Sequence, residues 1–81
     1  MALTRDDLLH FMDAELGLDV STLEDSALLF STGMIDSFML ITLMTYIEAQ
    51  GGFRIAPGDV TLDNLDSIER IMGFSQRMAG G

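Results

Sequence analysis

The sequence predicts an all-α protein, a small four-helix bundle in a single domain over residues 1–81. Apolar residues recur at helical spacing in three separate segments, and no segment alternates as a strand does. The apolar residues make up 48% of the chain and include seven Met, whereas sheets favour Val and aromatic residues. We therefore expect three long helices and one short helix, with a long ordered loop between helices one and two.

The first helix is expected over residues 5–16. Thr4 is a good N-cap, and Asp7 occupies the capping-box position three residues later. The apolar residues that fall on one helical face are Leu8, Leu9, Met12 and Leu16. Gly17 then predicts the end of the helix.

A long connection follows, from Leu18 to Asp36, and it combines turn residues with apolar ones. A disordered linker would not carry so many apolar residues, which here are Val20, Leu23, Leu28, Leu29, Phe30 and Ile35. We predict an ordered loop fastened to the core, with a short turn of helix near residues 26–29.

The second helix is expected over residues 37–50, with Asp36 as its N-cap and Gly51-Gly52 as its end. One face carries Leu40, Leu43, Met44 and Ile47, and Phe38 and Ile41 widen it. A helix that is apolar around so much of its girth is either central or presents an apolar patch for binding.

The rest of the chain predicts a short helical turn around residues 57–62, because Pro57 suits a helix start. A last helix begins near Asp66, which forms a second capping-box pattern with Glu69, and ends by Met78. Its apolar face contains Ile68, Ile71, Met72 and Phe74.

Charge and composition exclude several functions. Thirteen acids against four arginines give a net charge of −9, which disfavours nucleic acid and anionic membrane surfaces as partners. The acids would favour partners with basic surfaces, or they may serve solubility alone. With no cysteine and one histidine, we expect neither a disulfide nor a metal site. No targeting or membrane-spanning segment is visible, so a cytoplasmic protein is expected.

Ser37 is the residue most suited to chemistry. It opens the central helix directly after Asp36 and is expected to be exposed at the junction of loop and helix. The start of a helix favours an anion, so a phosphodiester on this serine would be well placed. No histidine is near in sequence to activate the hydroxyl. Ser37 is therefore interpreted as the substrate of another enzyme rather than as a catalyst.

The segment Gly33-x-x-Asp36-Ser37-Phe38 resembles the attachment motif of acyl and peptidyl carrier proteins, and the order of elements along the whole chain is similar. The stretch 53–57 also resembles that family's exit from its second helix. The resemblance implies that Ser37 receives 4′-phosphopantetheine from coenzyme A through a phosphopantetheinyl transferase. It further implies that the arm holds acyl or aminoacyl groups as thioesters, and that a loading enzyme (an adenylation enzyme, ligase or acyltransferase) and downstream biosynthetic enzymes are the partners.

Two departures from the resemblance concern partner binding. Phe38 stands where Leu is usual, and the central helix has only Glu48 as an acid after Asp36. We expect a mainly hydrophobic docking surface formed by Met34, Phe38 and Met39. This is similar to stand-alone carriers of specialised pathways. The alternative for Met34 and Met39 is a place in the core.

Two other functions stay open, and the chain contains a second candidate serine. The chain could be a non-catalytic helical adaptor, or a degenerate carrier, that binds a partner through the apolar face of the second helix. It could be a small hydrolase, but His10 is the only histidine available as a base, and we expect no enzyme. Asp66-Ser67 is a second Asp-Ser pair, which we interpret as ordinary capping. The cargo and the pathway are not predicted, and a monomer is the simplest assembly.

Overall fold

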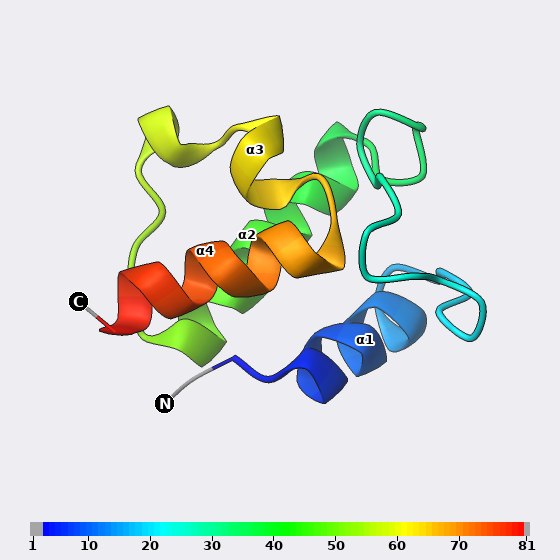
Figure 1. Ribbon diagram of the computed structural model, residues 1–81, viewed down its shortest axis with the longest axis horizontal. Helices are drawn as coiled ribbons and strands as arrows, with labels where there is room; N and C mark the ends of the chain where they lie inside the picture. Colours follow the sequence, from blue (N-terminus) through cyan, green and yellow to red (C-terminus); the bar gives the residue numbers. More distant parts are fainter. Residues whose placement is uncertain (1–2, 81) are drawn as a thin grey trace.

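A computed structural model describes residues 3–80 of the chain. In chain order it contains α1 (Arg5–Ala14), α2 (Ser37–Gly51), a 3₁₀ turn η1 (Pro57–Asp59), α3 (Leu62–Leu65) and α4 (Ile68–Gly80) (Figure 1). No strand occurs among the described residues. The predicted all-α class with four α-helices is thus confirmed.

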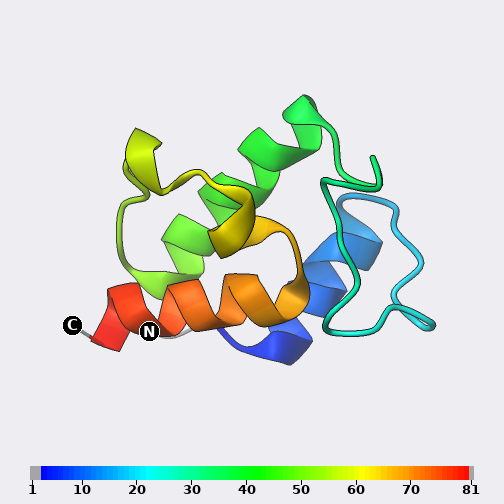
Figure 2. The same ribbon diagram turned by 45° about the horizontal axis from the view of Figure 1, so that its top comes forward.

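The helices surround one core, and α4 contacts each of α1, α2 and α3. Figures 1 and 2 show the connection between α1 and α2 at one end of the molecule, the end at which α2 begins. Core residues with no more than 2% exposure come from all four helices and from the connection: Leu8, Met12, Leu29, Leu43, Ile47, Leu65, Ile68, Ile71 and Phe74. None of the helices within residues 3–80 is long and apolar enough to cross a membrane.

The start of α1 follows the prediction. The Asp7 N–H donates to Thr4 Oγ1 over 3.1 Å, which confirms Thr4 as the N-cap. The helix ends at Ala14, two residues earlier than expected, and Gly17 adopts a φ of +67° as the chain turns away. The Leu18 N–H then donates to the Met12 carbonyl at 3.0 Å, which satisfies one of the last carbonyls of the helix.

An aromatic contact joins α1 to α2. The rings of Phe11 and Tyr46 stack with centroids 4.0 Å apart, and the Tyr46 hydroxyl donates to the Asp7 carbonyl at 3.0 Å. This pair was not predicted, because neither ring belongs to the apolar faces that were identified by their spacing.

Residues 15–36 form turns, and the helical turn predicted near residues 26–29 is wrong. A turn closes instead between Glu24 and Ala27, where the N–H of Ala27 donates to the Glu24 carbonyl over 3.1 Å. Three apolar residues of this stretch are buried, Leu16 at 8%, Leu29 at 0% and Ile35 at 3%, whereas Leu28 is 39% exposed. At its outer side, the guanidinium of Arg5 donates to both carboxylate oxygens of Asp25.

The chain between α2 and α4 differs from the prediction in detail. The single turn expected over residues 57–62 is divided into η1 and α3, separated by Val60 and Thr61. The N–H of Ile55 donates to Glu48 Oε2 over 2.7 Å, which ties the exit segment back to α2. The last helix begins at Ile68 rather than near Asp66 and runs to Gly80, beyond the expected end at Met78.

Candidate functional site

Ser37 is the first residue of α2, and it is exposed. Asp36 precedes it in an extended conformation, and its carboxylate accepts the Met39 N–H at 2.9 Å. This is the N-cap expected from the sequence. The cap pairs one of the N–H groups of the first turn that have no partner within the helix, directly next to Ser37.

The turn before Ser37 depends on Gly33. Its φ of +77° lies in the left-handed region, which glycine adopts without steric cost. The N–H of Gly33 donates to the Phe30 carbonyl, and that of Ile35 donates to the Leu29 carbonyl, each over 3.0 Å. Because Ile35 is buried, the chain is held in place two residues before Ser37.

The two Asp-Ser pairs lie in opposite environments. Ser67 is only 2% exposed, and its Oγ accepts the Arg70 N–H at 3.1 Å, so it caps α4. The predicted capping box of Asp66 with Glu69 is therefore wrong, because the capping residue is the next one along. Of the two pairs, only the first presents its serine to solvent.

Asp66 has a different role, which the sequence did not reveal. Its carboxylate is 2% exposed and accepts hydrogen bonds from the backbone N–H groups of Leu29, Phe30 and Ser31. Burial raises the pKa of Asp66, but the hydrogen bonds from Ser31 and from these N–H groups outweigh burial and leave the pKa below its ordinary value.

An exposed apolar surface lies beside Ser37. Phe38 is 82% exposed, Ile41 is 64% exposed and Met34 is 40% exposed. Phe38 and Ile41 therefore form an exposed apolar patch on α2, which is one of the two possibilities expected for this helix. They are three residues apart, so they are neighbours on the outer face of the helix. Met39, which was expected to form the docking surface with Met34 and Phe38, is half-buried and packs against the core.

No charged residue occurs in α2 before Glu48. The hydroxyls of Thr42 and Thr45 donate to the carbonyls of Phe38 and Ile41, one turn earlier. These hydroxyls are therefore partly satisfied within the helix. The outer face of α2 is consequently uncharged, in a protein whose net charge is −9.

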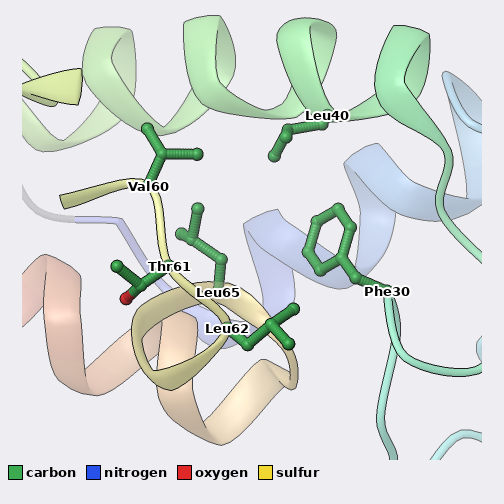
Figure 3. A pocket seen from close by; sticks show the side chains of 6 residues that line it. All are labelled: Phe30, Leu40, Val60, Thr61, Leu62 and Leu65. Atoms are coloured by element: carbon green, nitrogen blue, oxygen red, sulfur yellow. The ribbon is translucent and has the colours of Figure 1, made fainter. Parts of the chain in front are cut away.

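A cavity of about 170 Å³ lies between α2, α3 and the loop before Ser37. Figure 3 shows side chains from the loop, from α2 and from α3 pointing into it. Its lining is almost wholly apolar and consists of Phe30, Leu40, Val60, Thr61, Leu62 and Leu65. Two of these residues, Leu62 and Thr61, are exposed at its rim.

The elements of a serine hydrolase are not brought together. His10 is exposed on α1, and within residues 3–80 the Ser37 hydroxyl makes no hydrogen bond to a basic side chain. A serine without a base is weakly nucleophilic. Among the described residues, Ser37 is thus an exposed serine with no base hydrogen-bonded to it.

Together these features define a small all-helical domain that presents one serine at the capped start of its longest helix. A family model described as "Phosphopantetheine attachment site" matches residues 6–73, and the chain belongs to this family. A search of curated proteins and a search of solved structures returned no match.

Members of this family carry 4′-phosphopantetheine covalently and are in general non-catalytic carriers. The residues around Ser37 fit such a group. The hydroxyl is accessible, the start of α2 favours the negative charge of a phosphodiester, and the neighbouring Asp36 carboxylate is directed to a backbone N–H.

The sequence located the candidate serine and its cap but missed other parts of the site. Ile41 was grouped by its spacing with the apolar face of the second helix and was not named as part of the docking surface. Asp66 was missed because its partners lie 35 to 37 residues away in the sequence. The cavity was missed because three segments form it.

Proposed function

We propose that residues 1–81 form one monomeric carrier domain, with the 4′-phosphopantetheine arm attached to Ser37. The observation that carries this proposal is the exposure of Ser37 at the start of α2, within the matched residues 6–73. The buried Ser67 is a poor substrate by comparison.

When bound, the arm supplies a terminal thiol that holds an acyl or aminoacyl group as a thioester. The chain itself contributes an accessible hydroxyl, a helix start that favours the phosphodiester, and surfaces that other proteins recognise. In this proposal, a phosphopantetheinyl transferase modifies Ser37, a loading enzyme (an adenylation enzyme, ligase or acyltransferase) adds the cargo, and biosynthetic enzymes in the cytoplasm receive it. The carrier performs no catalysis of its own.

Docking of these enzymes is proposed at the exposed apolar surface beside Ser37, formed by Met34, Phe38 and Ile41, together with the partly buried Met39. Exposed aromatic and Met side chains give adaptable contacts. The absence of charge in α2 before Glu48 supports recognition by apolar contact more than by charge.

A second candidate is a helical adaptor, or a degenerate carrier without an arm. The high exposure of Phe38 and Ile41 supports it, because an exposed apolar helix face fits a groove on a partner. The two candidates differ in one respect, which is whether Ser37 accepts the arm.

Intact-protein mass spectrometry tests the proposal. The apo protein is incubated with coenzyme A and a broad-specificity phosphopantetheinyl transferase. We expect the wild type and the Ser67→Ala variant each to gain one phosphopantetheine, and Ser37→Ala to gain none while its circular dichroism stays helical. Wild-type protein that is folded and gains nothing would favour the adaptor.

A further inference from the structure

Asp66 lies at the junction of α3 and α4 and is the only buried charged residue among residues 3–80. A buried carboxylate is costly unless donors surround it. Asp66 is not the cap of α4, because Ser67 has that role. The role of this buried charge is therefore to be found in the residues that donate hydrogen bonds to it.

All the hydrogen bonds of the Asp66 carboxylate come from one short segment of the loop. The N–H groups of Leu29, Phe30 and Ser31 converge on Oδ1 at 3.1, 2.7 and 3.1 Å, and the Ser31 hydroxyl donates to Oδ2 at 2.6 Å. The Leu29 N–H also donates to the Asp66 carbonyl at 2.7 Å. Three successive N–H groups can converge on one oxygen only in a particular backbone conformation, so the carboxylate and the loop fix one another.

Asp66 is also the only residue that links residues 28–35 by hydrogen bonds to other parts of the described chain. Within the described chain, every hydrogen bond that joins residues 28–35 to a residue outside them ends on Asp66. The other hydrogen bonds of the segment are local, such as that from the Ile35 N–H to the Leu29 carbonyl.

The hydrogen bonds from residues 29–31 to the Asp66 carboxylate, here called the clamp, lie close to Ser37 along the chain. The carboxylate holds Leu29, whose carbonyl accepts the Ile35 N–H, and the next residue is Asp36, the cap of α2. Ser37 follows directly. The clamp also holds Phe30, which lines the cavity next to α2.

We infer that Asp66 is a positioning residue for Ser37: it holds the loop of residues 29–35 in the conformation in which modifying and loading enzymes recognise the serine. This inference rests on the proposed attachment at Ser37. Asp66 acts through the backbone of the loop and touches neither the serine nor its substituent.

Two measurements on the full chain test the clamp, and the variant is Asp66→Asn. Its Oδ1 can still accept the N–H groups, but the negative charge and the Oδ2 acceptor are lost. We expect amide hydrogen exchange at Leu29, Phe30 and Ser31 to become about tenfold faster, since hydrogen bonds to a charged group are weakened. We expect kcat/KM for phosphopantetheinyl transfer to fall measurably but by less than tenfold, because the ordered fraction of the loop falls by less than the opening equilibrium constant rises.

Two further variants separate positioning from general stability. Ile71→Val removes one buried methylene from α4 and none of the hydrogen bonds of the loop, and is expected to leave both the loop exchange and the transfer rate unchanged. Ser31→Ala removes only the hydroxyl bond to Oδ2, and we expect a smaller change in the same direction as Asp66→Asn. Should Asp66→Asn fail to fold, the comparison of Ser31→Ala with Ile71→Val decides between positioning and general stability.

Unchanged loop exchange, or unchanged transfer kinetics with faster loop exchange, would overturn the inference. Equal slowing of transfer in Ile71→Val would overturn it too, because loss of stability would then explain the effect. Wild-type protein that accepts no arm contradicts the proposed function itself, and this result is seen before any variant is compared.

Discussion

At the scale of single residues, Phe38 and Leu43 lie on the same helix but differ in what covers them. Phe38 is 82% exposed and Leu43 is fully buried. We expect Phe38→Ala to change the free energy of unfolding by no more than about 0.5 kcal/mol and to slow turnover by partner enzymes. Leu43→Ala should lower it by about 2–5 kcal/mol. Urea unfolding and a loading assay measure the two effects, and a large loss of stability in Phe38→Ala would contradict a docking role.

The Asp36 carboxylate caps α2 and also carries a negative charge beside Ser37, and two variants separate these roles. Asp36→Ala removes the acceptor of the Met39 N–H and should lower the free energy of unfolding by about 1 kcal/mol. Asp36→Asn keeps a capping oxygen and should be nearly as stable as the wild type. If transfer to Ser37 is slow in both variants, the enzyme recognises the charge. If it is slow only in Asp36→Ala, the helix start is what matters.

The caps of α1 and α2 could be predicted from the sequence because each depends on residues within three positions, as Thr4 and Asp7 do. Asp66 could not, since a buried acid before a serine and an exposed helix cap have the same local sequence. Its true partners, Leu29 to Ser31, are brought to it only by the fold.

At the scale of elements, the turn before α2 requires a positive φ at Gly33. At this position Gly33→Ala meets no atom within 4 Å, so the cost is conformational, about 1 kcal/mol. Gly58, in η1, is equally open but does not have a positive φ, and Gly58→Ala should be neutral or slightly stabilising. Thermal unfolding compares the two, and equal stability of both variants would contradict the role assigned to this turn.

Helix existence was easier to predict than helix ends. The apolar spacing of α1, α2 and α4 identified each of them, because a buried face repeats at the helical period. The start of α4 was placed too early, since Asp66 and Ser67 are both good caps by sequence. The turn near residues 26–29 was predicted from composition, yet burial of Leu29 and the hydrogen bonds to Asp66 hold this stretch in a non-helical form.

At the scale of the whole molecule, stability should decline in acid. The pKa of Asp66 is below its ordinary value in the folded protein, so folding favours the ionised form. That contribution is complete above the unfolded pKa of about 3.9 and is lost as the pH falls through the lower folded pKa. The exposed Asp19 and Asp25, whose pKa values are also lowered, add smaller contributions of the same sign.

The Asp66→Asn variant isolates this contribution from the rest of the charge. Protonation of the other acids relieves repulsion within a chain of net charge −9, but this occurs in both proteins. We expect the wild type to be the more stable protein at pH 7, and the difference in free energy of unfolding to shrink below about pH 4. Urea titrations at several pH values measure it, and a constant difference would contradict an ionised Asp66.

The central claim, attachment at Ser37, is tested most directly by locating the modification in the holo protein. Cleavage after arginine yields one peptide of residues 6–54, which contains Ser37 and three other serines, and a second of residues 55–70, which contains Ser67. Tandem mass spectrometry should find the phosphopantetheine on the first peptide and, by fragmentation, on Ser37. Its location on Ser67, or on Ser21, Ser26 or Ser31, would contradict the account.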